Sequence, residues 1–125
     1  MVYGIGTDIV ENGRIKAAVE KWGERFLERV FSDSEISFCM SRQDPYPSLA
    51  ARFAAKEAFI KAFSPFNAVS LRDIEVISDQ AGKPFLKLHG MTDRASKEKK
   101  ISGMHVSLSH EHDYSVAFVL LERTI

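Results

Sequence analysis

The chain has 125 residues, 45% of them hydrophobic and 27% charged, so it can bury a core and is expected to form one domain over 1–125. Lys plus Arg and Asp plus Glu number 17 each, which gives no basic field to favour a nucleic acid. The one cysteine, Cys39, excludes an internal disulfide and favours a reducing compartment, and no apolar run of membrane-spanning length occurs. We therefore expect a cytoplasmic protein without membrane or nucleic-acid partners.

The first third of the chain predicts one strand and two helices. Residues 1–10 are rich in β-branched residues and predict a strand, whose glycines allow another backbone to approach closely. Residues 12–31 have helical periodicity, interrupted by Gly23. Ser32 and Glu35 have the spacing of a capping box, so a short helix is predicted from there to about Met40. The side of the first helix expected to face the core carries Ile15, Val19, Trp22, Phe26 and Val30.

The remainder predicts a central helix followed by two strand pairs. The Ala-rich segment 48–63 has high helix propensity and lets neighbouring backbones come close. Residues 73–78 and 84–88 predict a hairpin around the turn 79–82, because Gly82 suits a positive φ. After a polar helix over 91–100, strands are predicted at 104–109 and 115–122. The expected class is α+β.

Two carboxylates stand among apolar residues, where a soluble domain normally tolerates none. They are Asp8, near the end of the first strand, and Glu57, on the central helix. A carboxylate removed from water is costly unless a cation or hydrogen bonds compensate it, so the pair indicates a divalent metal such as Mg²⁺. Because Lys61 follows Glu57 by one turn, phosphoryl transfer is the leading chemistry.

Each of these residues also has an ordinary explanation. Asp8 alone would be read as the cap of the following helix. Glu57 and Lys61 alone would be read as a helical ion pair, which contributes about 0.2–0.5 kcal/mol. His105 and His110 lie five residues apart on a strand, which places them on opposite faces and argues against one metal site. With one cysteine and scattered histidines, zinc is weakly supported.

The first helix carries a basic stripe beside a separate stripe of glutamates. Taken alone, this pattern is typical of a solvated helical face. The residues of the basic stripe are Arg14, Lys21, Arg25 and Arg29.

Four motifs, in order and across nearly the whole chain, resemble the holo-acyl-carrier-protein synthases, which are small 4′-phosphopantetheinyl transferases. The motifs are Gly4-Ile5-Gly6-Thr7-Asp8-Ile9-Val10-Glu11, Arg52-Phe53-Ala54-Ala55-Lys56-Glu57-Ala58, Gly82-Lys83-Pro84 and His105-Val106-Ser107-Leu108-Ser109-His110. The resemblance implies a fold in which an antiparallel sheet wraps around a central helix. It also implies transfer of 4′-phosphopantetheine from coenzyme A to a serine of apo-acyl carrier protein, in fatty acid biosynthesis, with release of adenosine 3′,5′-bisphosphate.

By position, the resemblance implies that Asp8 and Glu57 hold Mg²⁺, or Mn²⁺ in its place, against the coenzyme A pyrophosphate. Lys61 would reach the same phosphates and assist the leaving group or the attacking hydroxyl. His110 is a further catalytic candidate. The base that accepts the serine proton is left open between Glu57 and a metal-bound water.

The resemblance further implies that His105 and the turn Gly82-Lys83-Pro84 lie at the adenosine 3′-phosphate end of coenzyme A. The basic stripe would dock an acidic acyl carrier protein through Arg14, Arg25 and Arg29, with apolar contact from Phe26. Homotrimers with sites between subunits are expected for chains of this length. The segment 64–70, Ser-Pro-Phe-Asn-Ala-Val-Ser, departs from the family's Gly-rich loop, and Pro65 stiffens the region expected near the pantetheine arm.

Two other functions are weighed against the transferase. A metal-dependent phosphohydrolase or nuclease would also use Asp, Glu and Lys, but the chain lacks a basic excess for a nucleic-acid backbone. A noncatalytic module that only binds acyl carrier protein would not need Glu57 or Lys61. The substitution Glu57→Gln separates the binding module from the transferase. A binding module would keep its activity, whereas the transferase would lose turnover and still dock the carrier protein.

Overall fold

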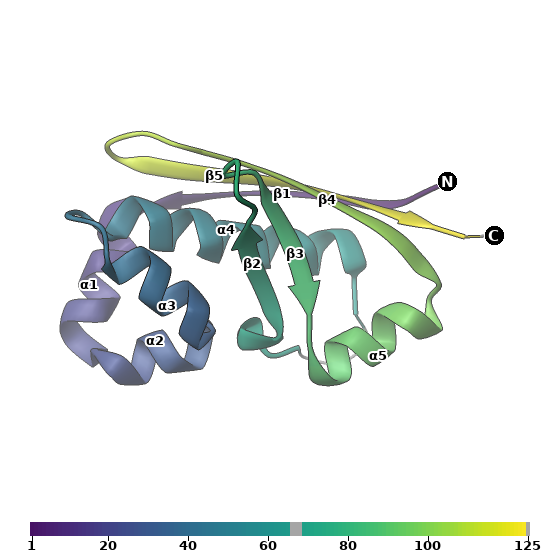
Figure 1. Ribbon diagram of the computed structural model, residues 1–125, viewed down its shortest axis with the longest axis horizontal. Helices are drawn as coiled ribbons and strands as arrows, with labels where there is room; N and C mark the ends of the chain where they lie inside the picture. The colour runs from purple at the N-terminus through teal and green to yellow at the C-terminus, as the bar shows by residue number, and fades with distance from the viewer. Residues whose placement is uncertain (66–68, 125) are drawn as a thin grey trace.

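A computed structural model describes residues 1–65 and 69–124 of the chain (Figure 1). The described chain combines helices with antiparallel strands, which confirms the predicted α+β class. No helix among the described residues is long and apolar enough to cross a membrane. In chain order the elements are β1 (Val2–Glu11), α1 (Asn12–Trp22), α2 (Glu24–Val30), α3 (Asp33–Met40), α4 (Tyr46–Phe63), the 3₁₀ helix η1 (Leu71–Asp73), β2 (Ile74–Ser78), β3 (Pro84–Leu88), α5 (Gly90–Glu98), β4 (Ile101–His110) and β5 (Tyr114–Arg123).

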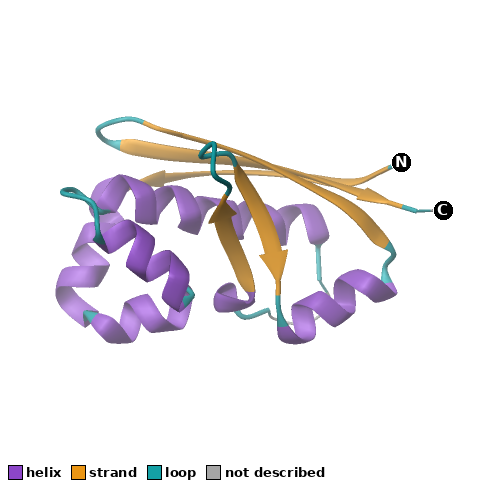
Figure 2. Ribbon diagram, in the orientation of Figure 1, coloured by secondary structure: helices purple, strands orange, loops and turns teal. Residues whose placement is uncertain are grey.

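The described strands form two separate antiparallel sheets, one of three strands in the order β1-β5-β4 and one formed by the hairpin β2-β3. The long helix α4 lies along one face of the three-stranded sheet, which we call the inner face (Figure 2). Helices α1, α2 and α3 gather near the start of α4, and the hairpin crosses it further along. The predicted central helix is thus confirmed.

The approach of β1 to α4 depends on two glycines in the strand. A Cβ atom on Gly4 would overlap the carbonyl of Ala62, and one on Gly6 would overlap the carbonyl of Ala58. Since only glycine leaves room for such contact, these positions set the distance between strand and helix. They also show that β1 and α4 run in opposite directions.

The core lies between α4 and the inner face of the sheet. On β5 the residues of that face are buried and alternate with exposed ones, as period-2 geometry requires. The opposite face, which we call the outer face, exposes apolar side chains to solvent. They include Ile5 at 57%, Ile9 at 61%, Val116 at 36% and Phe118 at 43% exposure.

One expectation about the first helix is wrong. Gly23 adopts φ 57° and ends α1, so α2 starts in a new direction and the helical periodicity does not continue across it. Trp22, the last residue of α1, is 52% exposed instead of facing the core. The predicted capping box is confirmed, because Ser32 accepts from the Glu35 amide while Glu35 accepts from the Ser32 amide. The hairpin turn is also confirmed, with Gly82 at φ 84°.

Candidate active site

Asp8 lies on the inner face of β1, two residues beyond Gly6, and pairs across the sheet with the buried Ala117. Its side chain is 18% exposed. The ammonium of Lys61 compensates this partly buried carboxylate, with Nζ 3.1 Å from Oδ1 of Asp8. The same Nζ donates to the carbonyl of Thr7 at 3.0 Å. Lys61 and Asp8, 53 residues apart in sequence, thus meet at the edge between β1 and α4.

Glu57 lies on the same flank of α4 as Lys61, since residues four apart on a helix share a face. Because β1 and α4 run in opposite directions, Asp8 lies towards the start of α4 relative to Lys61, which is also where Glu57 lies. The Glu57 side chain is half-buried. Among the described residues it has no hydrogen-bond or ion-pair partner, so the helical pair with Lys61 does not form. Its carboxylate oxygens are free to accept a ligand.

The donor set of this flank fits a magnesium ion. No group of three or more His, Cys, Asp or Glu side chains in the described part of the chain could hold a metal. Two carboxylates are nevertheless what Mg²⁺ commonly takes from a protein, since it completes its shell with water and substrate phosphates. Asp8 and Glu57 supply hard oxygen donors, and Lys61 supplies a further positive charge nearby.

A second feature is a pocket of about 630 Å³ between α3, α4, the β2-β3 hairpin and the end of β4. Gly82 and Pro84, from the turn highlighted in the sequence, line it, and so does His110. Lys83 is exposed at the same turn. Asp8, Glu57 and Lys61 are not among its lining residues in the described chain.

Two arginines that sequence reasoning did not assign supply positive charge to this pocket, whose lining also includes Asp79. Arg42 and Arg52 both line it, and their guanidinium carbons lie 4.7 and 4.4 Å from the ring centroid of Phe38. Arg52 donates to Ser48 at 3.0 Å, but its Nε is buried without a hydrogen-bond partner among the described residues. An unpaired buried donor on a cation favours an anionic ligand. The signal was present in the sequence, because Arg52 opens the second motif.

His105 and His110 are separated, as predicted. His105 pairs with Leu120 across the sheet and Leu120 pairs with Ile5, so its side chain lies on the outer face, opposite Asp8. There its Nε2 lies 2.7 Å from Oε1 of Glu122. A single chain therefore does not bring His105 to Asp8 or to the pocket.

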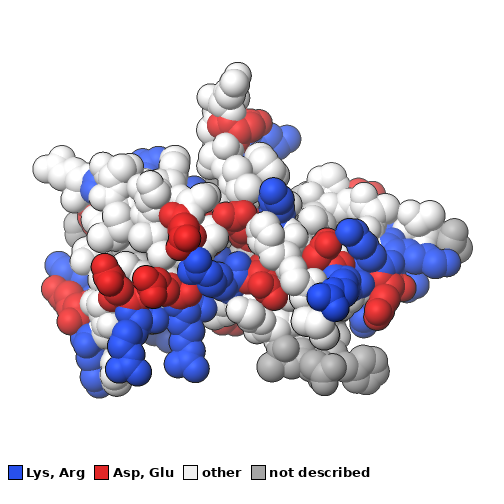
Figure 3. Space-filling view, turned by 60° about the horizontal axis from the view of Figure 1, so that its bottom comes forward, with Lys and Arg blue, Asp and Glu red and all other residues white. Residues whose placement is uncertain are grey.

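The predicted docking residues lie on exposed helical surface. Arg14 on α1 and Arg25 and Arg29 on α2 are all exposed. Phe26 is half-buried and its ring makes an edge contact with Phe31. Figure 3 shows basic and acidic side chains interspersed on the left of the molecule, where these helices lie. The break at Gly23 divides the predicted stripe between two helices.

Comparison with known proteins gives consistent matches over nearly the whole chain. The family model described as 4′-phosphopantetheinyl transferase superfamily matches residues 4–119. A holo-[acyl-carrier-protein] synthase of Halothermothrix orenii is 48% identical, with 98% of each chain covered. The crystal structure of the holo-[acyl-carrier-protein] synthase from Neisseria meningitidis superimposes with a TM-score of 0.90 at 39% identity, covering 98% of this chain and 100% of that one.

A second solved structure bears on the ligand. A Chronobacterium ammoniagenes synthase in complex with coenzyme A matches with a TM-score of 0.86 at 33% identity, covering 98% of both chains. These matches point to the same family as the order of the motifs and the antiparallel sheet around α4. The chain therefore belongs to the holo-[acyl-carrier-protein] synthase family of the 4′-phosphopantetheinyl transferase superfamily.

Proposed function

We propose that this enzyme transfers 4′-phosphopantetheine from coenzyme A to a serine hydroxyl of apo-acyl carrier protein, a step that supplies fatty acid biosynthesis. The serine hydroxyl gives its proton to Glu57 or to a water and its oxygen forms a bond to the β-phosphorus, while the bond from that phosphorus to the bridging oxygen breaks and releases adenosine 3′,5′-bisphosphate. The observation that carries the proposal is the flank of β1 and α4 where Lys61 meets Asp8 beside Glu57, whose carboxylate has no partner among the described residues.

In this proposal Asp8 and Glu57 would hold Mg²⁺, or Mn²⁺ in its place. When bound, the metal would neutralise charge on the pyrophosphate. Lys61, whose side chain is 55% exposed, would exchange its contact with Asp8 for a phosphate oxygen. Its ammonium would then stabilise the charge that develops on the leaving group.

The pocket lined by Arg42 and Arg52 is the proposed site for the adenosine 3′-phosphate end of coenzyme A. Gly82 and Pro84 line it, in keeping with what the motif implies, and Nε of Arg52, which has no hydrogen-bond partner among the described residues, would donate to a phosphate oxygen. Lys83 adds a positive charge at the turn. His110 lines the same pocket and is therefore proposed as a substrate-binding or catalytic residue.

A homotrimer is proposed because the outer face exposes several large apolar side chains and carries His105. Burying that face against neighbouring subunits would remove Ile5, Ile9 and Phe118 from solvent. It would also let His105 of one subunit approach the coenzyme A site of the next, which a single chain does not allow. Light scattering should give three times the chain mass, and Phe118→Lys should lower both this mass and activity. A monomeric, fully active wild type would contradict the proposal.

The acyl carrier protein is proposed to dock on α1 and α2 through Arg14, Arg25 and Arg29, with Phe26 at the edge of the contact. Charge complementarity of this kind mainly raises the association rate. Arg25→Glu should therefore raise KM for the carrier protein roughly tenfold at low salt and leave KM for coenzyme A unchanged. The matched control is Lys87→Glu, a charge reversal at an exposed position on β3. Equal effects of both variants would contradict docking at this surface.

The proposed location is the cytoplasm. The only cysteine, Cys39, is a buried free thiol, and a chain that relies on no disulfide suits a reducing compartment. The expectation for the loop 64–70 falls partly outside the described residues, since 66–68 are not among them.

The decisive experiment measures the intact mass of an apo-acyl carrier protein after incubation with this enzyme, coenzyme A and Mg²⁺. A gain of one phosphopantetheine group that a chelator abolishes would support the transferase. Glu57→Gln should lower turnover by about two orders of magnitude while carrier binding is retained.

Two other results would contradict the proposal. Release of the adenosine bisphosphate without any gain in carrier mass would indicate a phosphohydrolase. Carrier binding that is retained, with no mass gain from several competent carriers, would indicate a binding module.

A further inference from the structure

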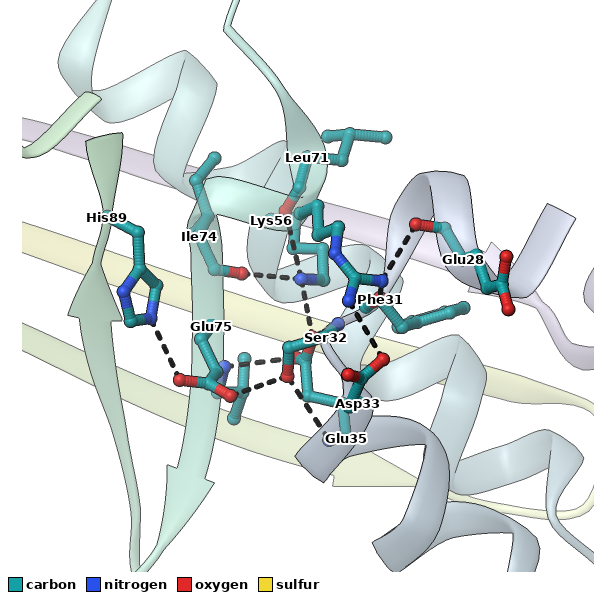
Figure 4. Close-up of polar contacts among 12 residues, drawn as sticks. Glu28, Phe31, Ser32, Asp33, Glu35, Lys56, Leu71, Ile74, Glu75 and His89 are labelled. Atoms are coloured by element: carbon teal, nitrogen blue, oxygen red, sulfur yellow. Dashed lines mark hydrogen bonds and ion pairs between the residues drawn. The ribbon is translucent and has the colours of Figure 1, made fainter. Parts of the chain in front are cut away.

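The residue before Glu57 is a fully buried lysine. Lys56 has 0% exposure and lies in the interior on the side of α4 that faces α3, η1 and β2. Its Nζ donates to Oε1 of Glu35 at 2.8 Å, to the carbonyl of Leu71 at 2.9 Å and to the carbonyl of Ile74 (Figure 4). These contacts match the three donors that an ammonium has. One side chain thus connects α4 to three other elements.

The carboxylate of Glu35, the ionic partner of Lys56, is itself fixed by hydrogen bonds. Its side chain has 0% exposure and accepts from the amide of Ser32 at 2.8 Å and from the amide of Val76 at 3.0 Å. The capping box therefore does more than cap the N-terminus of α3. It fixes the carboxylate that receives Lys56 and attaches it to β2.

The polar contacts continue to the surface through a second carboxylate. Ser32 donates to Glu75 of β2, and the other oxygen of Glu75 lies 2.9 Å from Nε2 of His89 (Figure 4). Arg72 forms a separate branch that donates to the carbonyls of Glu28 and Phe31 and to Asp33. None of the hydrogen bonds of Arg72 in the described chain reaches α4.

The hydrogen bonds of Lys56 and the contacts of Gly4 and Gly6 of β1 lie on opposite sides of α4. A helix advances about 100° per residue, so Lys56 and Ala58, which meets Gly6, lie about 160° apart, and Glu57 lies midway along the remaining arc of about 200°. We propose that Lys56 is a positioning residue, which with Glu35 fixes the rotation of α4 so that Glu57 faces the flank shared with Asp8 and Lys61. A small rotation of the helix about its axis would leave the core apolar but would carry the Glu57 carboxylate away from Asp8.

This inference rests on the proposed role of Glu57 as a metal ligand, and its ordinary alternative is that Lys56 serves stability alone. The positioning role and the purely stabilising role predict different metal affinities for Lys56 variants. Partners that orient a ligand change metal affinity by about 10- to 100-fold when they are substituted, whereas a purely stabilising contact leaves the affinity of the folded enzyme unchanged.

The test measures Mn²⁺ binding by electron paramagnetic resonance, in the full-length enzyme with coenzyme A and without carrier protein, against a blank of Mn²⁺ and coenzyme A. The variants are Lys56→Met and, because that change leaves Glu35 unpaired, the double variant Lys56→Met with Glu35→Met. Replacing both charges with apolar side chains is the change that buried ion pairs tolerate best. Arg72→Met is the matched control, and circular dichroism at the temperature of the titration selects folded protein.

The expected result is a 10- to 100-fold weaker Mn²⁺ affinity in the folded Lys56 variants, with kcat lowered and KM for the carrier protein unchanged. Arg72→Met should bind Mn²⁺ like the wild type. Wild-type affinity in the folded Lys56 variants, or an equal loss in Arg72→Met, would overturn the positioning role. Glu57→Gln is titrated in parallel. If that variant keeps wild-type affinity, the proposed metal site itself fails.

Discussion

The two ion pairs of helix α4 lie five residues apart and have opposite characters. Lys56 and Glu35 meet at 2.8 Å with both side chains at 0% exposure. Lys61 and Asp8 meet at 3.1 Å with side chains at 55% and 18% exposure. The first pair is buried and its polar atoms are hydrogen-bonded within the protein. The second pair is open to solvent between β1 and α4.

Their physical chemistry follows from this difference. Burial lowers the pKa of Lys56, and the carboxylate of Glu35 opposes that effect. Removing one partner from such a pair leaves an uncompensated buried charge, whereas an exposed pair contributes little and exchanges readily. One helix therefore uses Lys56 to hold the fold together and, five residues later, presents Lys61 to a substrate.

The largest predicted effect compares the two lysines directly. Lys56→Met should lower the free energy of unfolding by about 3–5 kcal/mol, because Glu35 is left buried without its partner. Lys61→Met should cost less than about 1 kcal/mol, because its pair is exposed and screened. Urea denaturation of both variants measures the difference. Equal losses would mean that burial does not distinguish the pairs.

A smaller effect is predicted from the strand that carries Asp8. Gly6→Ala should destabilise the fold by about 1–3 kcal/mol, since the new Cβ overlaps the Ala58 carbonyl and forces β1 away from α4. It should also abolish most activity by separating Asp8 from Lys61. Gly13→Ala serves as the control, because only the Glu11 side chain lies near its added Cβ, at 3.5 Å. Thermal denaturation and the carrier mass assay together test this; an active, stable Gly6→Ala variant would contradict it.

The smallest effect concerns acid stability in the network around the buried pair. Burial raises the pKa of Glu75, but hydrogen bonds from Ser32 and His89 outweigh it and hold the pKa below its ordinary value of 4.5. The resulting stability is fully present above pH 4.5 and is lost as the pH falls through the lower folded value. The stability gap between wild type and Glu75→Gln should therefore shrink between pH 5 and pH 2. A gap that is constant with pH would contradict this assignment.

Much of the fold was readable in the sequence because the signals are local. The capping box of Ser32 and Glu35, the hairpin turn with Gly82 and the Ala-rich central helix all depend on neighbouring residues. Trp22 was placed wrongly because a helical projection gives the side on which a residue lies but not where the helix ends, and α1 ends at Trp22. Lys56 was overlooked, although Phe59 and Phe63 share its side of α4 and indicated that this side is buried.

The sequence by itself determined the residue types of the site and their order, since carboxylates among apolar residues need compensation wherever the chain folds. Only the tertiary structure decided which cation meets which carboxylate. Glu57 has its natural helical partner in Lys61, yet Lys61 reaches Asp8 on β1 and leaves Glu57 unpartnered among the described residues. The glycines of β1 let Asp8 approach α4, although it is far from that helix in sequence. The periodicity of either segment alone does not predict how close they come.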